Sequence, residues 1–388
     1  MSGPVPPGAS GHRGRRPGRV GRAIVAIAIA VVVATASFGI YEYEVSLPPN
    51  GEATLVVYTY ASLFGGADCG APAFSTVFGA FGSAHHVRVE VECPAGTLLS
   101  TLEQQSGSPG ADVVIGLDEL TAPVAQADHL LLPYRPPALA NVPPSLVAEL
   151  SPDFAAVPYE YGYLAIDYNA SFAAATGGAV AHSSFLNFTE NATWARGLLT
   201  ENPEFDITGQ EFLVWQIEYY SQVLHQNWQS FWTTVWSEGL PDPAPDWGTA
   251  FGEFSASSGN PPMVVSYSTD PAYAAANGEA GAFNSTVSWA NATAYGWRTI
   301  YGIGIVNGTH EAPLAEAFEN WFLNGTVQNE IPLNEWEYPA NSTVPLPSVY
   351  AAALDPATIV PLNADLPPSA VPSNLPTWIQ QWLALAPS

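Results

Sequence analysis

The stretch ATLVVYTY, residues 53–60, is a short run of β-branched, apolar and aromatic residues, which is typical of a buried strand. A helical pattern follows over 71–82, then the strand HVRVEVE at 86–92, a helix near 97–105 and the strand ADVVIGL at 111–117. Strands that alternate with helices indicate a parallel sheet with helices on both faces. We therefore expect an α/β fold.

A second alternating region begins with VPYEYGYLAIDYN at residues 157–169, and the 388-residue chain is long enough for two compact domains. Further elements are predicted as helices from about residue 208, from about residue 226, over 247–255 and over 313–325, strands at 263–267 and 297–306, and a C-terminal helix at 377–386.

The N-terminal region has a different composition. Residues 1–22 contain five of the nine basic residues, and residues 23–40 form an uncharged, mostly apolar run. A helix of that length covers roughly the hydrocarbon thickness of a membrane, and the positive-inside bias keeps the basic cluster in the cytoplasm. We predict a basic cytoplasmic tail (1–22), a transmembrane anchor or a cleaved signal segment (23–40), and a tether (41–52). The sequence does not decide whether residues 23–40 are a retained anchor or a cleaved signal segment.

The chain carries 35 acidic residues against 9 basic ones, which makes nucleic acid and anionic lipid poor partners. We expect contact with the membrane through the N-terminal segment only, and an extracytoplasmic location for the rest. In such a compartment Cys69 and Cys93 are predicted to form a disulfide, with two free buried thiols as the alternative. Eight glycosylation sequons agree with this location, at Asn169, Asn187, Asn191, Asn284, Asn291, Asn307, Asn324 and Asn341.

The sequence contains no GxSxG elbow, no phosphate-binding glycine loop with Lys and no HExxH, so no catalytic residue, metal site or cofactor is predicted. Instead, aromatic residues fall on predicted turns. Any one of them is explained by core packing, but their shared setting indicates a ligand site. In parallel sheets ligands bind beyond the carboxyl ends of strands, where Tyr60, Gly116 and Asp118 are expected. The aromatic residues on predicted turns are Tyr159, Tyr161, Trp247, Tyr267, Tyr273, Trp336 and Tyr338.

An ordered set of motifs resembles the thiamine-binding extracytoplasmic substrate-binding proteins of ABC importers. The motifs are VVYTYASL, ADVVIGLDEL, VPYEYGYLAIDYN, TENPEFDITGQEFLVW, DWGTAF, VVSYSTDPAY and IPLNEWEYP, and they cover about residues 53 to 386. Proteins for ferric ion and polyamines share the fold. The resemblance implies a type II periplasmic-binding-protein fold with two lobes that close on a ligand. The first lobe is expected from residues 53–156 with 275–388, and the second from residues 157–274.

The resemblance also implies the site. Trp247, Tyr267, Tyr273 and Trp336 match family aromatics, the two tyrosines being walls of the cleft on a crossing segment, and Gly116 and Asp118 match a GLD turn. Asp118 has an equal alternative role as a helix cap. Thr208 and Gly209 begin a helix that favours an anion, although a simple Thr cap explains them as well. The predicted ligand-binding residues are Tyr60, Gly116, Asp118, Asp206, Thr208, Gly209, Trp247, Tyr267, Tyr273 and Trp336.

Two departures from the family affect the expected ligand. Ala61 replaces a usual acidic residue, whose contact is then missing or supplied by Asp68 or Glu119. Glu204 and Asp206 would repel a diphosphate unless protonated, so free thiamine is favoured over its phosphate esters.

The predicted function is capture of thiamine and its delivery to an ABC permease, without enzymatic activity. The alternatives are another small cation, such as a polyamine or ferric ion, or an enzyme acting on thiamine-like compounds. Tyr219 and Tyr220 suggest iron ligands only superficially, because neighbours in a helix cannot both face one site.

Overall fold

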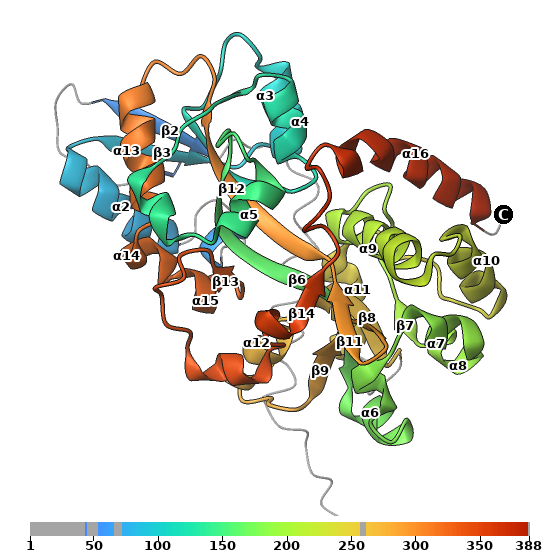
Figure 1. Cartoon of the computed structure of the whole chain (residues 1–388). Helices are drawn as coiled ribbons and strands as arrows, with labels where there is room; N and C mark the ends of the chain where they lie inside the picture. The colour runs from blue at the N-terminus through green and yellow to red at the C-terminus, as the bar shows by residue number, and fades with distance from the viewer. Residues whose placement is uncertain (1–42, 45–52, 66–71, 257–260, 387–388) are drawn as a thin grey trace, which may run out of the picture.

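The computed structural model describes residues 43–44, 53–65, 72–256 and 261–386 (Figure 1). The predicted tail and the predicted anchor or signal segment lie outside these residues, as does Cys69, so the bridge to Cys93 stays a prediction. Within the described ranges, no helix is both long enough and apolar enough to span a membrane.

The first part of the sheet consists of three parallel strands. Central strand β2 pairs with β3 on one side and β4 on the other, with Leu55 opposite Val89. Alternate residues of β2 are buried because helices cover the sheet. The strands are β2 (Thr54–Tyr58), β3 (Arg88–Glu92) and β4 (Val113–Asp118), and the helices between and after them are α2 (Pro72–His85), α3 (Leu98–Gln104) and α4 (Ala122–Ala127).

Two long strands, β6 (Val157–Asn169) and β12 (Arg298–Val306), connect the two halves of the molecule (Figure 1). Strand β12 lies between β4 and β6 and is antiparallel to both. The prediction of a parallel sheet is therefore wrong for these strands. The reason is connectivity: β6 carries the chain out of the first half and β12 brings it back, so they run in opposite directions.

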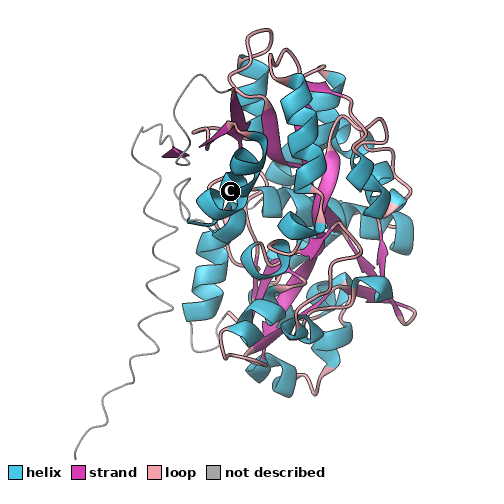
Figure 2. Cartoon of the chain, turned by 90° about the vertical axis from the view of Figure 1, so that its left-hand side faces the viewer, coloured by secondary structure: helices cyan, strands magenta, loops and turns pink. Residues whose placement is uncertain are grey.

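The far half of β6 belongs to the second part of the sheet. There β6 pairs antiparallel with β8 (Met263–Tyr267) and β9 (Phe283–Thr286), and β7 (Leu198–Leu199) runs parallel to β8. Helices lie outside the strands on both sides (Figure 2). The helices of this half are α6 (Ala170–Ala175), α7 (Phe185–Glu190), α8 (Ala192–Arg196), α9 (Ile207–Glu218), α10 (Gln229–Ser237), α11 (Trp247–Ala256) and α12 (Asp270–Ala276).

Short elements complete the fold. The strands are β1 (Tyr43–Glu44), β5 (Leu131–Leu132), β10 (Ser288–Ala290), β11 (Thr293–Gly296), β13 (Tyr338–Pro339) and β14 (Ile359–Pro361). The helices are α5 (Pro144–Leu150), α13 (Ala312–Phe322), α14 (Gly325–Gln328), α15 (Ile331–Asn334) and α16 (Ala370–Leu385), with a π-helical turn at Tyr219–Leu224. Five 3-10 turns are at Leu63–Gly65, Pro137–Asn141, Ala179–His182, Ser348–Ala352 and Pro356–Thr358.

Two large hydrophobic cores make the fold two-lobed. The first core joins β2, β3 and β4 to the start of β6, to β12 and to α13. The second core joins the end of β6 to β8, α9 and α10. It also contains Trp297 and Trp382, so α16 packs on the second half beside α9 and α10 (Figure 1). The predicted lobe boundaries stay a proposal.

The structure corrects two local expectations. Tyr159 and Tyr161 lie within the 13-residue strand β6, which continues through both parts of the sheet. Tyr338 lies in β13, which pairs with β6, so none of the three is on a turn. Asn341 is 1% exposed and its side-chain amide donates to the Leu323 carbonyl, so this sequon is inaccessible in the folded chain.

Candidate functional site

Trp247, Tyr267 and Thr208 come together at the junction of β8, α9 and α11. The Tyr267 and Trp247 ring centroids are 6.2 Å apart, and the Tyr267 phenol lies 3.0 Å from the Thr208 hydroxyl. The Trp247 indole N–H donates to the Ser266 hydroxyl over 2.9 Å, and Ser266 in turn donates to Asp270. These bonds fix both rings. The two tyrosines are not on a crossing strand, because Tyr267 ends β8 and Tyr273 lies in α12.

The start of helix α9 is capped by Asp206, not by Thr208. The Asp206 carboxylate accepts hydrogen bonds from the Gly209 amide and the Trp247 amide, each at 3.2 Å. A Cβ on Gly209 would lie 2.7 Å from the Glu201 carbonyl oxygen, so glycine is needed for close backbone packing. Burial raises the pKa of Asp206, while these amides oppose the shift. The helix end that was expected to favour an anion is therefore occupied by the protein's own carboxylate.

Tyr60 and Gly116 meet on the first half of the molecule. Gly116 has a φ of +108°, and a Cβ there would lie 2.4 Å from the Tyr60 ring, so only glycine lets the ring lie flat on the strand. The Tyr60 phenol lies 3.0 Å from the Tyr159 phenol and donates to Glu335 over 3.0 Å. Tyr60 is thereby held at the end of β2, as the sequence predicted.

Asp118 acts as a local cap. One of its oxygens accepts from the Leu120 amide, the Thr121 amide and the Thr121 hydroxyl, at 2.8 to 2.9 Å. Burial raises its pKa, and these donors oppose the shift. The neighbouring Glu119 accepts from the Trp297 indole N–H at 2.7 Å and from the Ile300 amide at 3.0 Å. Glu119 therefore braces β12 against β4. Asp68, the other residue proposed to supply the contact that Ala61 lacks, lies outside the described residues.

Tyr273 and Trp336 form a separate pair. Their ring centroids are 5.1 Å apart in an edge-to-face arrangement, and Trp336 has a φ of +59°. A bulky residue in this left-handed region is held there by its surroundings at an energetic cost, which is common at ligand sites.

Tyr301, Glu211 and Glu337 lie between these groups and were missed by the sequence analysis. The ring of Tyr301, on β12, has its centroid 6.3 Å from that of Tyr60. Burial raises the pKa of Tyr301, and so do the charges of Tyr267, Glu211 and Asp118. One sequence signal was present for Glu211: it follows Thr208 by three residues, and residues at this spacing share a helix face.

The tyrosine pair considered as iron ligands belongs to the second core. The Tyr219 phenol donates to the Trp289 carbonyl at 2.7 Å, and Tyr220 is 1% exposed. Among the residues that the structure describes, no three His, Cys, Asp or Glu side chains are arranged to hold a metal ion.

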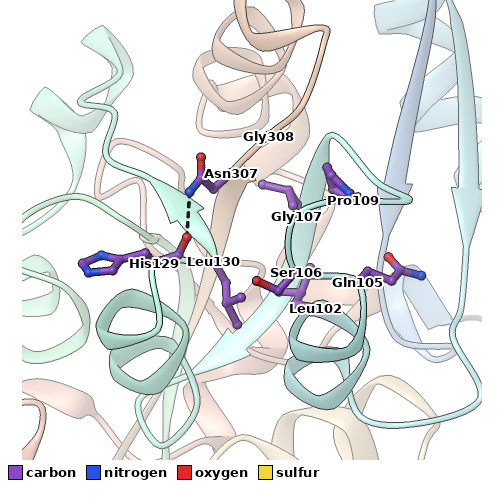
Figure 3. A pocket seen from close by; sticks show the side chains of 10 residues that line it. Leu102, Gln105, Ser106, Gly107, Pro109, His129, Leu130, Asn307 and Gly308 are labelled. Carbon is purple, nitrogen blue, oxygen red and sulfur yellow. Dashed lines mark hydrogen bonds between the residues drawn. The ribbon is translucent and has the colours of Figure 1, made fainter.

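A pocket at the opposite end of β12 contains none of the predicted site residues. It lies where the Asn307 amide donates to the His129 carbonyl over 2.8 Å, beside the end of α3 (Figure 3). Asp118, at the other end of β4, pairs with Tyr301 near the start of β12, so the length of the sheet separates this pocket from the aromatic groups.

Comparisons with known proteins agree with this architecture. No protein-family model matches the chain. Thiamine-binding periplasmic proteins of Brucella melitensis and Brucella suis are each 26% identical over 291 residues, which are 74% of this chain and 79% of theirs.

Among solved structures, a periplasmic thiamin binding protein has a TM-score of 0.67 at 21% identity and covers 88% of this chain and 100% of its own. A ferric binding protein from Campylobacter jejuni has a TM-score of 0.66 at 14% identity, covering 86% and 99%. The chain is a two-lobed α/β protein that is similar in sequence to thiamine-binding periplasmic proteins and similar in fold to periplasmic binding proteins.

Proposed function

We propose that this protein captures thiamine outside the cytoplasm, between its two lobes, and delivers it to an ABC permease. The support comes from the relatives named thiamine-binding periplasmic proteins and from the residues around Tyr267. The N-terminal apolar segment is proposed to hold the protein at the membrane or to direct its secretion.

The observation that carries the proposal is the placement of Trp247 and Tyr267 next to buried carboxylates. Thiamine has a permanently charged, flat thiazolium ring, and an aromatic face within about 6 Å of a cation contributes roughly 0.5 to 2 kcal/mol. Asp206 accepts from the Trp247 amide at 3.2 Å, and the fully buried Glu211 is the carboxyl group that raises the pKa of Tyr267 most after burial. An aromatic wall with nearby negative charge suits an aromatic cation.

The capping of helix α9 supports free thiamine over its phosphate esters. A phosphate at this helix end would have to displace the Asp206 carboxylate from the Gly209 amide. Arg298, the first residue of β12, forms a salt bridge with Glu149 at 2.7 Å. Its guanidinium group also lies over the Tyr163 ring. The Asp206 cap and the pairing of Arg298 with Glu149 both disfavour an anionic ligand.

Another small organic cation is the second candidate, because Ala61 replaces an acidic family residue. Ferric ion is disfavoured by the packing of Tyr219 and Tyr220 in the second core. Catalysis is not part of the proposal.

The test is a calorimetric and tryptophan-fluorescence titration of the purified full chain with thiamine, thiamine mono- and diphosphate, spermidine and ferric citrate. We expect saturable one-to-one binding of thiamine that Trp247→Ala weakens at least tenfold. Trp378→Ala, on the outer helix α16, is the matched control and leaves binding unchanged. Binding of spermidine but not of thiamine would show that the protein binds polyamines instead. If none of these cations binds, the proposed function is overturned.

A further inference from the structure

Glu211 is a buried carboxylate without a donor. Its side chain is 0% exposed, and neither oxygen accepts a hydrogen bond from any residue that the structure describes. An unpaired buried charge is costly, so such groups are neutral, paired or reserved for a ligand. Glu211 lies one helical turn after Thr208, whose hydroxyl contacts Tyr267. It therefore faces the proposed ligand site.

The groups around Glu211 are acidic or phenolic. The pKa of Glu211 is affected by Glu119 and Asp118, at the end of β4, and by Glu337, before β13. Glu211 in turn raises the pKa of Tyr267 on β8 and of Tyr301 on β12. Burial raises the pKa of Glu211 first, and these carboxylates raise it further. All of these effects favour the protonated form of Glu211.

Glu337 is a second buried carboxyl group, and one of its oxygens lacks a donor in the described part of the chain. Its carboxyl group lies against the backbone of Gly162, where a Cβ would be 2.1 Å from one oxygen, and that oxygen has no hydrogen-bond partner among the described residues. Burial raises its pKa, as do Asp270 and Glu335. Glu211 and Glu337 are thus buried carboxyl groups that influence each other electrostatically, and each has at least one oxygen without a donor among the described residues.

A purely structural role explains Glu211 poorly. Glu119 already accepts two hydrogen bonds, from Trp297 and Ile300, and a contact between the Glu119 and Glu211 carboxyl groups requires a proton on one of them. A glutamine would make the same contact without a titratable group. A glutamate at this position differs from a glutamine in that it can lose the proton and leave a carboxylate for a ligand.

From this geometry we infer that Glu211 is the specificity-determining counter-charge of the ligand site. It accepts a hydrogen bond from an N–H group of a bound cation, such as the amino group of an aminopyrimidine or an ammonium group. Binding replaces the Glu211 proton: the carboxylic O–H bond breaks, the proton leaves to buffer, and the carboxylate pairs with the ligand. This inference rests on the proposed function and names the part of the ligand that the site selects.

The test measures proton release during calorimetric titration of the full chain with thiamine in two buffers of different ionisation enthalpy. The wild-type protein is expected to release protons on binding. Glu211→Gln should bind at least tenfold more weakly and release fewer protons. The control is Glu319→Gln on α13, which alters an equally buried carboxyl group with an unpartnered oxygen outside this cluster, and it should match the wild type.

A ligand variant provides an independent readout that does not depend on folding of the mutant. Oxythiamine carries an oxo group in place of the amino group, so the wild-type protein should bind it at least tenfold more weakly than thiamine. Equal affinity for both compounds, or Glu211→Gln binding with wild-type affinity and proton release, overturns the inference alone. Wild-type protein that binds no cation overturns the proposed function together with it.

Discussion

The phenol oxygen of Tyr267 lies 3.0 Å from the hydroxyl oxygen of Thr208, which joins the end of β8 to the first turn of α9. Both residues were predicted from the sequence, but their contact was not. The bond fixes the direction of the Tyr267 ring, which also contacts Trp247.

We expect Tyr267→Phe and Thr208→Val each to weaken thiamine binding by about threefold to tenfold, since a typical hydrogen bond contributes about 0.5–1.5 kcal/mol. The double variant should be little weaker than either single variant, because both changes remove the same contact. Calorimetry on the four proteins measures this. Fully additive losses would show that the two hydroxyl groups act independently.

Asp206→Ser is predicted to change the preference between thiamine and its phosphate esters. Serine still caps the helix but removes the negative charge from its start, where the helix dipole favours an anion. We expect affinity for thiamine monophosphate relative to thiamine to rise about tenfold, as electrostatic contributions of about 1–2 kcal/mol allow. Competition binding checks the ratio. Asp246→Ser removes the corresponding charge beside Thr249 at the start of α11 and should leave the ratio unchanged.

Ser266 and Ser268 offer a matched test of how Trp247 is held. Ser266 accepts the Trp247 indole N–H at 2.9 Å and donates to Asp270, whereas the buried Ser268 hydroxyl has no partner among the described residues. Ser266→Ala is expected to lower the free energy of unfolding by about 1–3 kcal/mol, because it leaves buried groups unpaired, and to weaken thiamine binding. Ser268→Ala should be neutral in urea unfolding and in titration. Equal effects would contradict this role for Ser266.

Stability should fall as the pH rises. Burial, followed by the charge of Asp118, raises the pKa of Glu119 from 4.5 to about 8, and burial raises the pKa of Glu211 as well. The folded chain therefore binds more protons than the unfolded chain. The stabilisation is complete below about pH 4.5 and is lost as the pH rises through the folded pKa.

The melting temperature is accordingly expected to decrease between pH 5 and pH 8, with each such group contributing up to about 1.4 kcal/mol per pH unit. Glu211→Gln should flatten this dependence because it keeps a neutral side chain at every pH. The exposed Glu103→Gln is the control for the general acidity of the surface. A melting temperature that is constant or rises over this range would contradict the assignment.

Local patterns were sufficient to predict most elements. The strands at β2, β3, β4 and β8 and the helices α2, α9 and α13 lie within a few residues of the predicted ranges, because each depends on apolar periodicity and on nearby caps and turns. The motif at 157–169 indicates only the start of a second alternating region. A single 13-residue strand β6 that runs through both parts of the sheet was not foreseen, since periodicity gives no partner for a strand. The antiparallel position of β12 between β4 and β6 was not predicted for the same reason.

The family resemblance carried by the ordered motifs also implied the two-lobed fold and nominated aromatic residues for the site. The tertiary structure alone decided which of them meet. It placed Asp206 as the cap of α9, Asp118 as a local cap, and Glu211 and Glu337 in a buried region without donors. From the sequence alone, a carboxylate is expected to be a solvated surface group. Its protonation depends on burial and on neighbours that are distant in the chain but close in space, so only the folded structure determines it.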